Sequence, residues 1–333
     1  MFNIKKLATT VALSGILTGA FASAQAIELK ASHQWPGGKG DIRDEMVQMI
    51  ARHMQETNTG VDIKVYPGKS LFKPKEQWNA MTKGRLDITA FPLSYAGGRH
   101  PEFNLTLMPG LVKNHDHAAR LNQSPFMQRI KKIMDDAGVM VLADTWLAGG
   151  FVSKEKCILE PDDAKGMRFR AAGKAFNQML AAAGATITSM PSSEIYSGLQ
   201  TGVINGANTS SSSLVSYRIY EQVKCLTTPG DHALWVMYEP ILMAKASFDK
   251  LTPAQQEEIL KAGKLAEQYA REQSKVADQK LVEAYKKAGV EVVEMNDEQV
   301  AKWRAIADTS SYKAFADDVP GGRELLDMAL SVE

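Results

Sequence analysis

The chain has no marked excess of charge and few cysteines. Of its 333 residues, 39 are lysine or arginine, 38 are aspartate or glutamate, and two are cysteine. Nucleic acids and anionic membranes bind proteins through a surplus of basic residues, so this balance argues against both as partners. Beyond residue 26, no segment is long and apolar enough to cross a bilayer. The remaining length indicates two domains of ordinary size.

Motifs of common enzymes are also missing. No segment reads His-Glu-x-x-His, Cys-x-x-Cys or Gly-x-Ser-x-Gly. Gly37-Gly38-Lys39-Gly40 lacks the spacing of a dinucleotide-binding loop, and Gly173-Lys174 lacks the upstream glycine of a phosphate-binding loop. His115 and His117 are two residues apart on a predicted helix and therefore point to different faces. We expect neither catalysis, nor a cofactor, nor a bound metal.

The first 26 residues have the features of a secretory signal peptide. Lys5 and Lys6 precede an apolar run from Leu7 to Ala22, which the small residues Ala24-Gln25-Ala26 follow. The run is short for a membrane anchor, although an uncleaved anchor is the alternative. We expect an exported mature chain that begins at Ile27 and has 37 basic and 38 acidic residues.

Cys157 and Cys225 form an isolated pair. In the oxidising compartment that a signal peptide implies, such a pair favours a disulfide over a catalytic thiol or a metal site. Two buried free thiols are the alternative. An unstrained disulfide across a loop of this length would stabilise the fold by about 4 kcal/mol through the entropy of the unfolded chain.

Predicted strands and helices alternate along the mature chain, which indicates an α/β fold with a mainly parallel first sheet. We expect the chain to cross at Gly149-Gly150 into a second α/β set. The elements before that crossing are strand Ile27–Ser32, helix Asp41–Thr57, strand Val61–Tyr66, helix Lys75–Lys83, strand Leu86–Ala90, helix His115–Ala137 and strand Val139–Trp146.

A long helix is predicted after Thr252. This residue suits the N-cap, Pro253 takes the first helical position, Gln255 completes a capping box, and Gly289 suits the C-terminus. If continuous, the helix spans about 36 residues, or roughly 54 Å. Because this exceeds the width of one small domain, we expect a helix that joins two lobes. Two helices broken near Ser274 are the alternative.

A predicted strand, Gly166–Arg170, ends in a fixed cation. Its apolar residues Met167 and Phe169 alternate with Arg168 and Arg170, so apolar and basic side chains face opposite sides. The guanidinium of Arg170 then points beyond the sheet edge, where its geometry suits a carboxylate. The alternative is an arginine that is paired to an acid of the protein itself.

A set of segments spans nearly the whole mature chain: Tyr66–Leu71, Lys83–Ile88, Lys165–Arg170, Glu194–Ala207 and Phe248–Pro253. In sequence and in order, these segments resemble the DctP-type extracytoplasmic solute receptors of tripartite ATP-independent periplasmic (TRAP) transporters. The resemblance implies an α/β, two-lobed periplasmic-binding-protein fold (type II-like) with mixed sheets and a long helix spanning both domains. Domain I would comprise residues 27–149 plus 236–276, and domain II residues 150–235 plus 277–333, with the ligand cleft between them.

The resemblance also implies which residues contact the ligand. In the family an arginine on this strand binds the substrate carboxylate, and Arg170 is the matching residue. Thr209 takes a position that often supplies a polar contact, while Asn208 and Ser210 replace the family's usual glutamate and proline. The further predicted contacts are Ser192, Gln34, Trp35, Lys73, Phe91, Tyr95, Trp146, Trp235 and Tyr238.

The resemblance implies a periplasmic receptor that encloses its ligand by domain closure and delivers it to the TRAP membrane permease subunits, and we expect a monomer. Because many of these positions are aromatic, we expect the ligand to be an aromatic monocarboxylate. A receptor for an aliphatic keto or hydroxy acid, or for a sulfonate, is the alternative. Two other classes stay open at this point. One is a secreted hydrolase or lyase that uses Glu194 or a histidine, and the other is a receptor that presents its ligand to a membrane-bound sensor.

Overall fold

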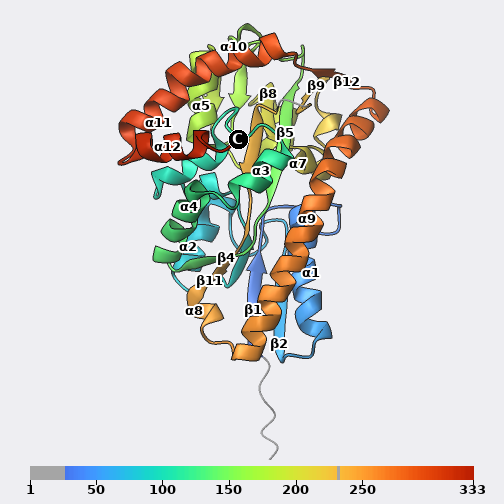
Figure 1. Ribbon diagram of the computed structural model, residues 1–333. Helices are drawn as coiled ribbons and strands as arrows, with labels where there is room; N and C mark the ends of the chain where they lie inside the picture. The colour runs from blue at the N-terminus through green and yellow to red at the C-terminus, as the bar shows by residue number, and fades with distance from the viewer. Residues whose placement is uncertain (1–26, 231–232) are drawn as a thin grey trace, which may run out of the picture.

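Two β-sheets form the framework of the molecule (Figure 1). The computed structural model describes residues 27–230 and 233–333, and the predicted signal peptide, residues 1–26, lies outside the described residues. The strand order of the first sheet is β2 (Val61–Tyr66), β1 (Ile27–Ser32), β3 (Ile88–Ala90), β11 (Ile241–Ala244) and β4 (Val139–Ala143). The strand order of the second is β12 (Glu291–Glu294), β9 (Cys225–Thr228), β5 (Trp146–Ser153), β8 (Gly206–Ser210), β6 (Arg168–Arg170) and β7 (Thr186–Thr188), and β10 (Trp235–Tyr238) pairs with β5. Both sheets contain parallel and antiparallel neighbours, as predicted.

Helices cover both sheets and join them. None of the helices in the described ranges has the length and hydrophobicity that crossing a membrane requires. The helices are α1 (Ile42–Glu56), α2 (Gln77–Thr82), α3 (His115–Leu121), α4 (Pro125–Asp136), α5 (Gly173–Ala182), α6 (Ile195–Gln200), α7 (Ser211–Ser216), α8 (Lys245–Phe248), α9 (Pro253–Lys287), α10 (Asp297–Ala307), α11 (Lys313–Asp318) and α12 (Gly322–Leu330).

Apolar side chains fill the space between helices and sheets. Met46 and Ile50 of α1 and Ala266 of α9 pack on one face of the first sheet. Phe176 of α5 and Trp303 of α10 belong to a separate cluster on the second sheet. A third cluster contains residues of both sheets, among them Leu242 of the first and Ala148 of the second. We call a sheet with its packed helices a lobe.

Two connections between strands pass from one lobe to the other side by side. β4 and β11 lie in the first sheet, while β5 and β10, their neighbours in sequence, lie in the second. The backbone N–H of Glu239 donates to the carbonyl oxygen of Thr145 over 2.9 Å and ties the two connections together. The chain thus passes between the sheets shortly before the predicted domain boundary at 149–150 and returns shortly after the predicted boundary at 235–236. The division into domains itself stays a prediction.

The predicted long helix is present as α9, which runs along both sheets in Figure 1. Thr252 and Gln255 form the predicted capping box, and the helix continues for 35 residues with Ser274 buried inside it. It packs against α1 in the first lobe and α7 in the second. The alternative of two helices is wrong.

Two predicted elements end earlier than expected. The helix predicted over residues 115–137 is two helices, because the side chain of Ser124 caps α4 and Pro125 takes its first position. The strand predicted to reach Trp146 ends at Ala143, since the chain there leaves the first sheet.

Gly149 and Gly150 lie within β5 and are not the crossing point. A Cβ atom on Gly149 would come 2.0 Å from the carbonyl oxygen of Thr209 on β8, and one on Gly150 would come 2.1 Å from that of Thr227 on β9. The two glycines allow these strands to approach closely, which is a packing role that their sequence position does not reveal.

The predicted disulfide joins Cys157, after β5, to Cys225 at the start of β9. Their thiols and the carboxylate of Glu291 make up the one group of possible metal ligands found among the described residues. Because both sulfur atoms are bonded to each other, no thiolate is available there to bind a metal.

We expect Gly263→Ala on α9 to destabilise the protein, although at an exposed helix position alanine is more stable than glycine by about 1 kcal/mol. A Cβ atom here would come 2.2 Å from the carbonyl oxygen of Leu142. Such overpacking costs about 1–3 kcal/mol, which urea unfolding would measure. The control is Lys264→Ala at the exposed neighbouring position. A more stable Gly263→Ala variant would contradict the close contact between α9 and this backbone.

Candidate ligand-binding site

Arg170 ends β6 as predicted, and its side chain is buried. Along this strand Arg168 is exposed and Phe169 is fully buried, while Arg170 is only 1 % exposed. β6 lies between β7 and β8 in the second sheet, and the chain turns into α5 directly afterwards. The strand therefore holds the guanidinium at its end, away from solvent.

The guanidinium of Arg170 is bonded only to neutral oxygens. Nε donates to the carbonyl oxygen of Met190 over 3.0 Å, and Nη1 donates to that of Asn208 over 2.5 Å. Nη2 donates to the hydroxyl oxygen of Tyr95 over 3.1 Å. In the part of the chain that the structure describes, no carboxylate forms an ion pair with Arg170. An arginine paired to the protein's own acid is therefore not what the structure shows.

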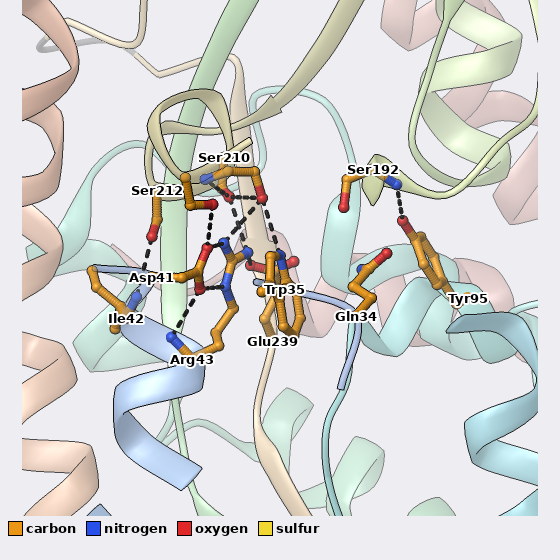
Figure 2. Close-up of polar contacts among 12 residues, drawn as sticks. Gln34, Trp35, Asp41, Ile42, Arg43, Tyr95, Ser192, Ser210, Ser212 and Glu239 are labelled. Atoms are coloured by element: carbon orange, nitrogen blue, oxygen red, sulfur yellow. Dashed lines mark hydrogen bonds and ion pairs between the residues drawn. The ribbon is translucent and has the colours of Figure 1, made fainter. Parts of the chain in front are cut away.

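Polar groups from both lobes surround this guanidinium. The hydroxyl oxygen of Tyr95 also accepts from the backbone N–H of Ser192 over 3.1 Å (Figure 2). Tyr217 donates its hydroxyl hydrogen to the carbonyl oxygen of Gln34 over 2.8 Å. Among the described residues, neither amide atom of the buried Gln34 side chain has a hydrogen-bond partner, nor does Nδ2 of Asn208. An unpaired buried polar atom costs about 1–3 kcal/mol, so these amides favour a polar ligand.

A second buried arginine, Arg43, lies at the start of α1. Its Nη2 pairs with Oδ2 of Asp41 at 2.7 Å, and its Nη1 pairs with Oε2 of Glu239. Its guanidinium carbon lies 3.9 Å from the centre of the Trp35 ring. Burial alone would lower the pKa of Arg43, but the negative charges of Asp41 and Glu239 outweigh burial and hold that pKa above its ordinary value.

The two arginines differ in their electrical compensation. Burial lowers the pKa of Arg170, because the opposing effects of Tyr95 and Glu239 are smaller. An arginine nevertheless keeps its charge inside a protein. Among the described residues, carboxylates contact Arg43 but not Arg170. The surroundings of Arg170 therefore favour contact with a bound anion, whereas those of Arg43 do not.

Serines of the second lobe contact the first lobe near Arg43 (Figure 2). The hydroxyl oxygens of Ser210 and Ser213 each accept from Arg43 over 3.0 Å. Ser213 also accepts from Nε1 of Trp35 over 3.1 Å, and Ser212 accepts from the first backbone N–H of α1 over 3.2 Å. These interlobe serine contacts lie at the end of β8 and the start of α7.

Four of the predicted contact residues, Arg170, Tyr95, Ser192 and Asn208, meet at one place through the hydrogen bonds given above. Thr209 follows Asn208 on β8 and is buried. Since neighbouring residues of a strand face opposite sides of the sheet, the side chain of Thr209 points away from that of Asn208.

The predicted aromatic contacts lie in different places. Phe91 packs edge-on against Tyr95, with ring centroids 6.2 Å apart. Trp146 and Tyr238 pack together at 4.9 Å beside the connections between the lobes. Of the remaining predicted contacts, Trp35 stacks on Arg43, Trp235 lies in the core of the second lobe, and Lys73 is exposed at the surface.

Sequence reasoning does not identify Asp41, Arg43 and Glu239 as parts of the site. In the sequence, Asp41 looks like an ordinary N-cap and Arg43 like an ordinary residue of the first helical turn. In the structure Asp41 does cap α1, and it also accepts from Nε of Arg43. A glutamate directly after an apolar strand is the one available signal, because such a position is prone to burial.

Comparison with known proteins gives the family. The sequence model of the bacterial extracellular solute-binding protein, family 7 (DctP), matches residues 32–318. The chain belongs to this family. A solute-binding protein of Albidiferax ferrireducens is 39% identical over 312 residues, which cover 92% of each chain. The C4-dicarboxylate-binding periplasmic protein DctP of Rhodobacter capsulatus is 27% identical over 86% of this chain and 85% of its own.

A solved structure supports both the family and the fold. A TRAP periplasmic solute binding protein from Rhodoferax ferrireducens, crystallised with bound malonate, is 39% identical and aligns with a TM-score of 0.88 over 91% of this chain and 98% of its own. The predicted receptor family and the two-lobed α/β fold are confirmed. Because the family consists of solute-binding receptors, the chain is not an enzyme, and the hydrolase or lyase alternative is wrong.

Replacing each arginine with methionine should separate their roles. Arg43→Met leaves Asp41 and Glu239 buried without their cation, so we expect the free energy of unfolding to fall by about 3–5 kcal/mol. Arg170→Met removes a cation that has no carboxylate partner, so we expect a smaller loss from the oxygens left unpaired. Urea unfolding of both variants measures this difference. Equal losses would contradict the contrast between the two sites.

Proposed function

We propose that this protein is the periplasmic receptor of a TRAP transporter and that Arg170 binds the carboxylate of a small organic acid. The supporting observation is the buried guanidinium with only neutral partners. Three of its five N–H groups are used, and a carboxylate can accept the two that remain. The malonate in the Rhodoferax ferrireducens relative agrees with a carboxylate ligand.

The unpaired amides of Gln34 and Asn208 favour an acid that carries further polar groups. A hydroxyl or keto oxygen accepts from an amide N–H, and a hydroxyl hydrogen can be donated to the amide oxygen of Gln34. An aliphatic hydroxy or keto acid is therefore the first candidate. A sulfonate would use the same arginine but offers no second polar group on its own.

The aromatic monocarboxylate predicted from the sequence is the second candidate. The observation that favours it is the edge-on pair of Phe91 and Tyr95, since Tyr95 bonds directly to Arg170 and could pack against an aromatic ring. The other predicted aromatic residues are engaged elsewhere, so this candidate depends on two rings.

We also propose how the receptor works in transport. In the periplasm, after removal of residues 1–26, the lobes of a monomeric receptor close over the acid, and the interlobe serine contacts hold them together. The closed form then delivers the acid to the TRAP permease subunits. Identification of the membrane protein that co-purifies with the closed form would distinguish the permease from a membrane-bound sensor.

Arg170→Ala should abolish most of the binding of malonate, because the incoming carboxylate would be buried without its cation. We expect a loss of about 3–5 kcal/mol, or more than roughly a hundredfold in affinity, measured by calorimetry. The matched control is Arg168→Ala on the same strand, whose exposed guanidinium donates to the carbonyl oxygen of Gly202. Near-normal affinity in the Arg170→Ala protein would refute the role of this residue.

A panel of acids should rank the ligand classes. We expect lactate, pyruvate and malonate to raise the melting temperature more than benzoate does, because only the first three can satisfy the amides of Gln34 and Asn208. The Arg170→Ala variant serves as the control for non-specific stabilisation. A larger shift with benzoate would favour the aromatic candidate instead.

A further inference from the structure

Glu239 contacts Arg43 from the connection between β10 and β11, and the two buried arginines bond to Ser210 and Asn208 of the same strand, β8. Its backbone N–H is fixed to Thr145, its side chain is buried, and its Oε2 pairs with Nη1 of Arg43. The charge of Arg170 also acts on this carboxyl group. Glu239 therefore connects the arginine that is proposed to bind the ligand with the arginine that has internal partners.

The four buried charges of this cluster balance. Arg43 and Arg170 contribute two positive charges, and Asp41 and Glu239 contribute two negative charges. An anion bound to Arg170 adds negative charge and cancels the field by which Arg170 favours the ionised form of Glu239. Since uncompensated charge is costly in a buried cluster, the binding of an anion favours protonation of one carboxylate.

Glu239 is better placed than Asp41 to accept this proton. The oxygens of Asp41 accept hydrogen bonds from the backbone N, Nε and Nη2 of Arg43 and from the hydroxyl of Ser216. A proton on Asp41 would displace one of them. Within the described residues, hydrogen bonds reach only Oε2 of Glu239, so Oε1 can take a proton without breaking a contact.

The other groups around Glu239 do not compete for the proton. Arg43 on α1 and Arg170 on β6 keep their charges. Burial raises the pKa of Tyr217, which faces Asp41 and Arg43 from the end of α7, well above its usual value, so its hydroxyl stays neutral. Tyr95 contributes a hydroxyl that is bonded to Arg170. For Glu239 itself, burial raises the pKa to about 6, against the opposing charge of Arg43.

We propose that Glu239 takes up a proton from solvent when a carboxylate binds at Arg170, so that the receptor captures its acid together with a proton. This inference rests on the proposed function of Arg170. Because the complex binds more protons than the free receptor, affinity rises as the pH falls, by at most about tenfold per pH unit. It becomes constant at a pH low enough to protonate Glu239 in the free receptor.

Calorimetry with malonate at about pH 7 tests the inference. Bis-Tris and Tris are suitable buffers, because they differ in ionisation enthalpy and neither is an anion that competes for Arg170. We expect the observed heat to differ between the buffers by an amount that corresponds to proton uptake. Glu239→Gln should abolish that difference, and the exposed Glu28→Gln, paired with Lys64, should retain it. Equal heats of wild type in both buffers would overturn the inference.

A second measurement needs no ligand. The folded-state pKa of Glu239 lies above its ordinary value of 4.5, so the folded protein binds the extra proton and its stability falls as the pH rises through about 6. Arg170→Gln removes a positive charge that opposes protonation of Glu239, so we expect the fall in stability to move to higher pH. In Glu239→Gln we expect this fall to disappear. An unchanged profile in Arg170→Gln would overturn the coupling. If malonate does not bind but the pH profile of stability is shifted in Arg170→Gln, the result would count against the proposed function and not against the coupling of Arg170 and Glu239.

Discussion

Arg170 places a full positive charge in a region that water barely reaches, and its three hydrogen-bond partners are neutral oxygens. Neutral acceptors satisfy N–H groups but do not cancel a charge. The fold stabilises this arrangement because β6 is held between two strands and Arg170 is anchored to Met190 and Asn208 from neighbouring segments. If Arg170 binds the ligand as proposed, a cation fixed in this way lowers the cost of ordering the site on binding.

The interlobe contacts follow the same electrostatic logic. Asp41 and Glu239 pair with the charge of Arg43. From the described part of the second lobe, the hydrogen bonds to Arg43 come from the hydroxyls of Ser210 and Ser213. Water can replace these hydroxyls as acceptors when the lobes separate. The lobes can therefore open without leaving a buried ion pair broken, which suits a receptor that must release its solute.

Local signals allowed much of the fold to be predicted. The N-cap, proline and capping box at Thr252 define the start of α9 through contacts within one turn, so no tertiary knowledge was needed. The split between α3 and α4 also has a local signal, Ser124 followed by Pro125, although apolar periodicity across it predicted one helix. Gly149 and Gly150 could not be interpreted locally, because their role depends on how closely β8 and β9 approach.

The site was predictable only in part, for a physical reason. The alternation in β6 and the family resemblance identified Arg170, but whether an arginine is compensated depends on residues far away in sequence. Arg43 is balanced by Glu239, 196 positions later, and nothing in the sequence near Arg170 excludes the same arrangement. Only the spatial neighbours distinguish the two.

Unsatisfied polar atoms and aromatic side chains point to different candidate ligand contacts. The polar ends of Trp146 and Tyr238 are bonded to Asn122 and Asp144, so neither leaves a polar atom that needs a ligand as its partner. The amides of Gln34 and Asn208 lack partners among the described residues, and a polar ligand would stabilise them. Nε1 of Trp235 is also buried without an acceptor in the described structure, but its ring packs in the core of the second lobe.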